Sequence, residues 1–190
     1  TDVLPAMGDH VVFDVQSDRV AFWSGEGAVF NVPVDQRAAA VLTDPAVRKT
    51  TYNLKETILK LLRHGIDLCA PYDDPMLMAY LLFPHRGKYE LADVAFELLG
   101  RTISPEEERT PWIDCVSKEL SPQVEEQVAR PYREIELPLS RVLVGMEMAG
   151  IRIDVGVLDR MSREMGTQLE ELTRHICQIA GCELNINSRL

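Results

Sequence analysis

The sequence has little positive charge for its length and no long hydrophobic run. Its 190 residues include 20 Lys and Arg against 30 Asp and Glu, which gives a formal net charge of −10. A free-standing nucleic-acid-binding protein needs a basic surface to neutralise phosphates, so this balance argues against that class. No apolar stretch approaches the roughly 20 residues that span a bilayer, and residues 1–10 lack a signal-peptide pattern. We therefore expect a cytoplasmic protein without a membrane partner.

Motifs that bind metals or phosphates are also lacking. The four cysteines form no Cys-x-x-Cys pair, and the four histidines are scattered without a His-x-x-x-His pattern. We interpret the cysteines as reduced core residues and expect no metal site and no cofactor in this chain. A Gly-x-x-x-x-Gly-Lys loop, which would bind a nucleotide phosphate, is absent as well.

The sequence does contain enough hydrophobic residues for a packed core, at 46% of the chain. Short β-rich runs come first, and a Ser-Gly-Glu-Gly turn at 24–27 predicts an antiparallel hairpin. Helical and extended patterns then alternate, which favours an α/β fold with a mixed sheet. We expect strands at 11–13, 19–23, 28–32, 49–52 and 66–69, and helices at 35–42, 54–64, 74–82 and 90–100.

The last third of the chain predicts long helices. Residues 101–131 form the least regular stretch because four prolines interrupt them. Beyond them, Pro138 predicts a kink or a helix start, Gly150 a helix end, and Asp154 the cap of the next helix. The residues spaced for the buried face of this first helix are Ile135, Leu139, Val142, Leu143 and Met146.

The second of these helices covers residues 155–179, with apolar residues at every third or fourth position. Its length would be about 37 Å at 1.5 Å per residue. Such a helix is too long to pack fully on a small domain, so we expect it to project.

Three stretches carry a resemblance to a known family. Residues 52–55 (YNLK) and 73–82 (DDPMLMAYLL) resemble landmarks of the 3′–5′ exonuclease domain of bacterial DNA polymerase I, a family A polymerase. The stretch 132–154 is similar to the segment that joins this domain to the polymerase domain. The residues that carry this last similarity are Tyr132, Arg133, Glu134, Glu136, Pro138, Leu139, Met146, Glu147, Gly150, Ile151 and Asp154.

The resemblance implies a ribonuclease H-like exonuclease fold for residues 1–130, followed by a linker helix and the base of the polymerase thumb at 131–190. It further implies that DNA and the remaining polymerase domains are the partners of the parent protein, and that Mg²⁺ serves the parent polymerase. A thumb segment near the DNA backbone would correspond to Asn185, Asn187, Ser188 and Arg189.

The acids of the exonuclease motifs are largely missing. Asp14-Val15-Gln16 matches the Asp-x-Glu motif but carries an amide in place of the second carboxylate. Thr57 stands where the Asn-Leu-Lys motif places an Asp, and no Tyr of the third motif, a Tyr with an Asp four residues on, occurs between Gly100 and Tyr132. Because the family's two metal ions need these carboxylates, the resemblance implies a degenerate exonuclease domain that supports the polymerase.

Two alternatives remain open at this point. One is a working metal-dependent exonuclease in which Glu56 replaces a lost acid, although Glu56 is one residue early and a helix turns by about 100° per residue. The other is a non-catalytic protein-interaction module that uses the acidic surface and the helix at 155–179.

Overall fold

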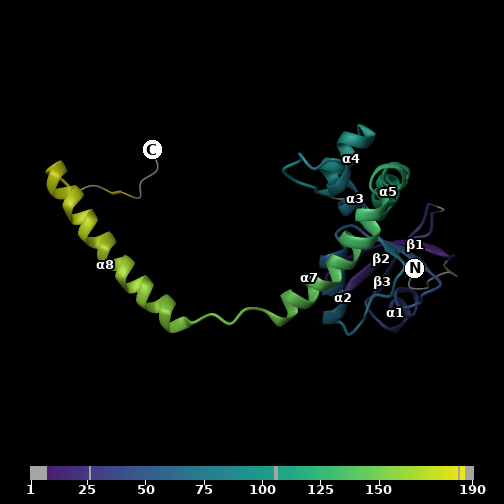
Figure 1. The fold of residues 1–190 in the computed structure, drawn as a ribbon, viewed down its shortest axis with the longest axis horizontal. Coiled ribbons are helices and arrows are strands. Elements are labelled where there is room, and N and C mark those ends of the chain that lie inside the picture. The colour runs from purple at the N-terminus through teal and green to yellow at the C-terminus, as the bar shows by residue number, and fades with distance from the viewer. Residues whose placement is uncertain (1–7, 26, 105–106, 184, 187–190) are drawn as a thin grey trace. The chain divides into compact units, whose positions relative to one another are not determined.

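The chain folds into two compact units. A computed structural model describes residues 8–25, 27–104, 107–183 and 185–186 (Figure 1). The first unit is Thr1–Ala149 and the second is Gly150–Leu190. The first unit thus reaches 19 residues beyond the domain end expected at residue 130. The assignment of 131–190 to a linker and thumb base stays a prediction.

A five-stranded mixed sheet forms the centre of the first unit, in the order β3-β2-β1-β4-β5. The first three strands pair antiparallel, whereas β4 and β5 run parallel to β1 and to each other, as a mixed sheet requires. The stretch 66–69, expected as a strand, is irregular, and the fifth strand lies a few residues later. The strands are β1 (His10–Gln16), β2 (Arg19–Trp23), β3 (Val29–Pro33), β4 (Arg48–Thr50) and β5 (Tyr72–Asp73).

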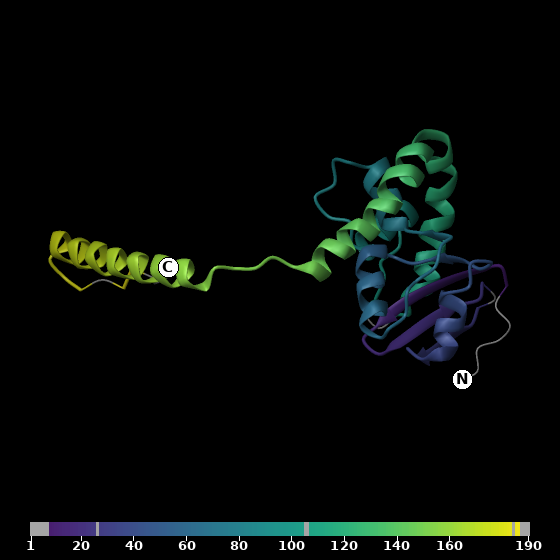
Figure 2. The same cartoon turned by 60° about the horizontal axis from the view of Figure 1, so that its bottom comes forward.

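Strand β1 is buried on both of its faces. Its residues 11–15 are all buried, and successive side chains of a strand point to opposite sides. The sheet must therefore be covered on both sides at this strand. Helices α2 and α5 both pack against β1 (Figure 2).

The first four helices start and end close to the expected residues. Asp35 caps α1, and Asp74 caps α3 in front of a proline at the first helical position. Gly100 ends α4 with a φ of +66°, a backbone conformation that favours glycine. The helices are α1 (Gln36–Leu42), α2 (Leu54–Arg63), α3 (Pro75–Leu82) and α4 (Leu91–Leu99).

The expectation of an irregular stretch at 101–131 was wrong. Helix α5 (Arg109–Gln127) is 19 residues long and packs on α3, α4, β1 and β2. Its first turn holds Pro111, where a missing N–H costs little, and it accommodates Pro122 in its interior. The burial of its apolar face, which includes Ile113, Leu120 and Val124, outweighs the cost of that proline.

A π-helical turn precedes the last helix of the first unit. The short helix α6 (Ala129–Pro131) leads into the π-helix η1 (Tyr132–Glu136), and α7 (Leu137–Ala149) follows. Pro138 is the second residue of α7, which agrees with the expected helix start, and Gly150 lies beyond its end with a φ of +66°.

The buried face predicted for α7 was wrong. The buried side chains are those of Leu137, Ser140 and Val144, which lie on the side where α7 packs on α2. On this helix Arg141 pairs with Asp67, and Glu147 pairs with Lys55 of α2. These ion pairs are consistent with this rotation of the helix. The residues expected inside are 38–65% exposed, namely Ile135, Leu139, Val142, Leu143 and Met146.

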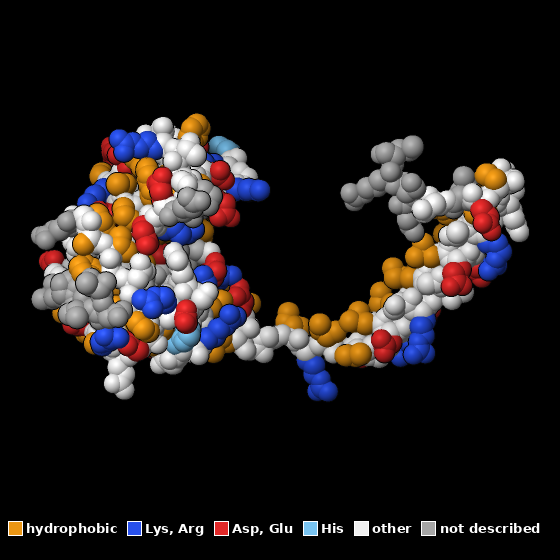
Figure 3. Space-filling view, turned by 180° about the vertical axis from the view of Figure 1, so that it is seen from behind, with side chains coloured by type: hydrophobic (Ala, Val, Ile, Leu, Met, Phe, Trp, Pro, Cys, Tyr) orange, Lys and Arg blue, Asp and Glu red, His pale blue; other side chains and the backbone are white. Residues whose placement is uncertain are grey.

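The second unit contains the long helix that the spacing predicts. Helix α8 (Val155–Ala180) is capped by Asp154, whose side chain accepts a hydrogen bond from the backbone N–H of Val157 at 3.1 Å. Gly181 ends it with a φ of +70°. Figure 3 shows the hydrophobic side chains gathered along one face of α8.

The described cysteines are free thiols, and none of them is fully buried, so their expected place in the core was wrong. In the described part of the chain, no helix combines the length and the apolar character needed to cross a membrane.

Candidate functional site

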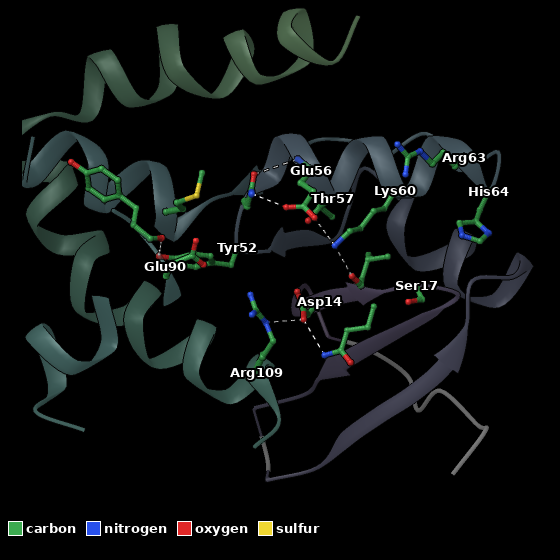
Figure 4. A pocket seen from close by; sticks show the side chains of 15 residues that line it. Asp14, Ser17, Tyr52, Glu56, Thr57, Lys60, Arg63, His64, Glu90 and Arg109 are labelled. Carbon is green, nitrogen blue, oxygen red and sulfur yellow. Dashed lines mark hydrogen bonds and ion pairs between the residues drawn. The ribbon is translucent and has the colours of Figure 1, made fainter. Parts of the chain in front are cut away.

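A cleft of about 670 Å³ opens beside the end of β1 in the first unit. Strand β1 forms its floor, α2 one wall, and the first residue of α5 closes the opposite side (Figure 4). The cleft brings together Asp14, Gln16 and Thr57, the three positions at which the sequence locates the exonuclease motifs. It is therefore the place where the chemistry of such a domain would occur.

Asp14 is nearly buried, at 7% exposed. Its Oδ2 atom accepts a hydrogen bond from Nε2 of Gln16 at 3.2 Å and lies 3.1 Å from Nε of Arg109. Asp14 and Gln16 share one side of the strand because they are two residues apart. The amide at position 16 thus donates to Asp14 at the place where a second carboxylate would accept.

Thr57 lies in the first turn of α2 and is buried, at 4% exposed. Its hydroxyl is 3.2 Å from the hydroxyl of Thr51. This hydroxyl is engaged within the protein, and it supplies no negative charge.

Glu56 is also part of the cleft lining, and each of its two oxygens has a donor within the protein. Its Oε1 pairs with Nζ of Lys60 at 2.9 Å, and its Oε2 accepts from the side-chain amide of Asn53 at 2.9 Å. Lys60 also reaches the backbone carbonyl of Val15 at 3.3 Å and so bridges α2 and β1. Glu56 would have to give up these partners to serve as a second metal ligand beside Asp14.

The third exonuclease motif has lost its tyrosine but has an aspartate at the corresponding spacing. Asp114 lies on α5, four residues after Thr110, and without a tyrosine at that position the motif gives no signal for this aspartate in the sequence. Asp114 is 7% exposed and accepts from the indole N–H of Trp23 at 3.0 Å and from Lys118 at 2.8 Å. It does not line the cleft of Asp14.

A divalent metal ion does not fit these residues. Such an ion requires several oxygen lone pairs aimed at one point, whereas Asp14 and both oxygens of Glu56 already have nitrogen donors within the protein. Within the described residues, no three His, Cys, Asp or Glu side chains are grouped so that they could hold a metal ion.

The Asp73-Asp74 landmark serves a structural purpose. Asp74 accepts from the backbone N–H groups of Asn53, Leu54 and Met76 and so caps both α2 and α3. Burial raises the pKa of Asp74 to about 6, and these backbone hydrogen bonds act in the opposite direction. Its own N–H donates to the hydroxyl of Tyr132, at 2.9 Å. This contact ties the start of η1 to the sheet.

The predicted nucleic-acid-binding residues lie beyond α8. Asn185 is exposed, whereas Asn187, Ser188 and Arg189 lie outside the described residues. Their role stays a prediction.

Two site residues were missed at the level of the sequence. Arg109 and Lys60 provide two of the three cations of the cleft, yet neither belongs to a motif of the family. Asp14 and Arg109 are 95 positions apart in the sequence, and no local sequence pattern indicates such a pair. The only signal for Lys60 is its distance of four residues from Glu56, the spacing of a helical ion pair.

Comparison with known proteins identifies the family. Residues 20–108 match the family model described as the ribonuclease H-like domain of DNA polymerase I. The thermostable DNA polymerase I of Thermus filiformis is 37% identical over 135 residues, a match that covers 71% of this chain and 16% of that protein. DNA polymerase I of Mycobacterium bovis is 27% identical over 216 residues, covering 97% of this chain and 24% of that protein.

Two solved structures share the fold. The POL domain of Pol1 from M. smegmatis, in complex with DNA primer-template and dNTP, has a TM-score of 0.73 at 22% identity, covering 94% of this chain and 35% of that chain. Brucella melitensis NrnC has a TM-score of 0.60 at 15% identity, covering 76% of this chain and 88% of that chain. The mixed sheet and its helices thus have the ribonuclease H-like exonuclease fold, and the chain belongs to the bacterial DNA polymerase I family.

Proposed function

We propose that this chain is the part of a DNA polymerase I that carries a degenerate, catalytically inactive 3′–5′ exonuclease domain. The observation that carries the proposal is the state of Asp14. It is the one motif acid in the cleft, and its Oδ2 atom is bound by Gln16 and Arg109. A hydrolytic site of this class needs two metal ions, which activate water and stabilise the leaving oxygen. The cleft supplies an amide and a hydroxyl, at Gln16 and Thr57, in place of two of the necessary carboxylates.

The charge of the cleft also argues against a site that holds a DNA end. Three carboxylates, those of Asp14, Glu56 and Glu90, face the cleft together with three cationic side chains, those of Lys60, Arg63 and Arg109. Binding a phosphodiester chain depends on an excess of positive charge, which this balance does not provide.

The role of such a domain in the parent is structural. It would support a polymerase domain that copies DNA in replication and repair with Mg²⁺, in the cytoplasm of a bacterium. Residues 131–190 would form the linker and the base of the thumb, with residues 185 and 187–189 near the DNA. The chain spans 16% and 24% of the two DNA polymerase I relatives described above, so the polymerase activity belongs to the parent.

The test is the degradation of an end-labelled single-stranded oligonucleotide by the purified chain, with Mg²⁺ and then with Mn²⁺. The Asp14→Ala variant is the control. We expect no shortening beyond that seen with the control in either metal. Stepwise 3′ shortening that disappears in Asp14→Ala would overturn the proposal in favour of a working exonuclease.

A further inference from the structure

The cleft contains a cation of its own beside Asp14, the residue at which the family motif places a metal ligand. Arg109 is the first residue of α5, and its Nε atom lies 3.1 Å from Oδ2 of Asp14. The same oxygen accepts from Nε2 of Gln16, 3.2 Å away. Figure 4 shows the Arg109 and Asp14 side chains directed toward each other across the cleft. Asp14 thus has a positively charged partner without any bound ion.

This partner comes from a different element from the one that carries Asp14. The contact connects the start of α5 to β1, and α5 packs on β1. The side chain of Asp14 is 10% exposed, whereas that of Arg109 is 44% exposed. A carboxylate that is so well shielded needs a partner, because an unpaired buried charge is strongly destabilising. Arg109 provides that compensation.

We propose that Arg109 is a built-in cation that has taken the place of the metal, so that the exonuclease site is closed by an added positive charge as well as by lost acids. This inference rests on the proposed inactivity of the domain. It predicts that restoring the missing carboxylate at position 16 does not by itself restore cation binding, because Arg109 occupies Oδ2 of Asp14 and offsets one of the two negative charges.

The geometry explains why the outcome depends on Arg109. The amide nitrogen of Gln16 lies within hydrogen-bonding distance of Asp14. In Gln16→Glu a carboxylate oxygen would take that position, and two carboxylates so close together need a cation between or beside them. With Arg109 present, its guanidinium supplies this charge. Without it, the two carboxylates are left uncompensated and attract a divalent ion.

The experiment compares Mn²⁺ binding by folded 190-residue variants. Free Mn²⁺ is measured from its electron paramagnetic resonance signal, and binding is checked independently by the shift in thermal unfolding temperature. We expect no binding by the wild type or by Gln16→Glu. We expect binding on the order of millimolar Kd by Gln16→Glu/Arg109→Ala, and a thermal shift of a few degrees at saturating Mn²⁺.

A matched variant tests the charge itself. Gln16→Glu/Arg109→Lys keeps a cation at position 109 and should bind at least tenfold more weakly than the Ala variant. Asp14→Ala/Gln16→Glu/Arg109→Ala removes one carboxylate and should lose binding. Equal Mn²⁺ affinity of Gln16→Glu and Gln16→Glu/Arg109→Ala would overturn the inference, as would no binding by the latter in its folded state.

These outcomes are separate from the proposed function. If the wild type shortens oligonucleotides, the domain is active and the proposed inactivity fails. If the wild type is inactive and Gln16→Glu alone binds Mn²⁺, the inactivity stands and only the role of Arg109 fails.

Discussion

Asp74 shows how a single carboxylate can organise two helices. Its two oxygens accept from Asn53, Leu54 and Met76, at distances of 2.7–3.0 Å. Because these N–H groups belong to the first turns of α2 and α3, the side chain satisfies donors that neither helix can satisfy internally. It also lies next to the hydroxyl of Tyr132, so the starts of α2, α3 and η1 converge at one residue.

The substitution Asp74→Asn should therefore destabilise the first unit by about 2–3 kcal/mol. An asparagine keeps one acceptor oxygen but turns an NH₂ group toward backbone donors that then lack a partner. The measurement is unfolding in urea, followed by circular dichroism. Asp35→Asn is the matched control, because Oδ1 of Asp35 caps α1 at an exposed site, a task that asparagine performs equally well. Its Oδ2 pairs with Arg37 at the surface, where the loss of an ion pair costs little. Equal losses at the two sites would contradict this explanation.

His10 should make stability depend on pH. His10 is exposed at the start of β1, but partial desolvation of its ring and the nearby Arg48 lower its pKa from the ordinary value of 6.5, while Asp114 and Asp73 act in the opposite direction and Lys118 adds a smaller lowering effect. A lowered pKa means that the native state binds the proton less tightly than the unfolded chain does. The histidine's contribution to stability is therefore present above pH 6.5 and is lost as the pH falls below that value.

The variant His10→Gln tests this sign. Glutamine can keep the contact that Nε2 of His10 makes with the hydroxyl of Thr50 at 2.9 Å. We expect the wild type to lose stability relative to the variant between pH 7 and pH 5, measured by urea unfolding at each pH. The comparison cancels the titration of Asp74, which occurs in both proteins. A constant difference across this range would contradict the lowered pKa.

At the scale of elements, α7 depends on its contacts with α2 more than on its own hydrophobic pattern. The side of the helix that faces α2 carries Val144, at 3% exposed, whereas Val142 is 57% exposed. Val144→Asp should cost about 3–5 kcal/mol because it places an unpaired charge in the core. Val142→Asp should change stability by no more than about 0.5 kcal/mol. Chemical unfolding of the two variants measures the difference, and a larger loss for Val142→Asp would restore the face predicted from the sequence.

The elements also show what the sequence could and could not reveal. Helices α2, α3 and α4 were predictable because capping residues and a terminal glycine are local signals. The buried face of α7 was not, because it is set by the packing of α7 on α2, a contact between segments that are far apart in the sequence. Helix α5 was not expected, because its prolines are local signals against a helix, whereas the buried face that stabilises it exists only in the packed domain.

The residues of the candidate site also differ in whether the sequence alone could identify them. Asp14, Gln16 and Thr57 were identified because the motifs are short, and the structure brings them into one cleft. Arg109 could not be identified, since its proximity to Asp14 exists only after β1 and α5 have packed together. A sequence motif shows which acids are missing. A cation from a distant segment, such as Arg109, can be located only in the folded structure.

At the scale of the whole molecule, the net charge of −10 limits what the chain can bind without the rest of its parent. The cleft adds no excess of positive charge, and association with DNA depends on phosphate neutralisation. We expect the purified chain to bind a fluorescein-labelled single strand with a Kd no tighter than about 10⁻⁴ M at 150 mM salt. Fluorescence anisotropy measures this affinity.

A repeat of the titration at 50 mM salt separates weak electrostatic contact from a built site. Contact through a few lysines and arginines should strengthen several-fold at the lower salt concentration, and Arg63→Ala should then reduce it, because Arg63 is a cation of the cleft lining. Micromolar binding at 150 mM salt would contradict this expectation. It would mean that the chain holds DNA through specific contacts, and that an acidic net charge does not prevent this fragment from acting on the nucleic acid itself.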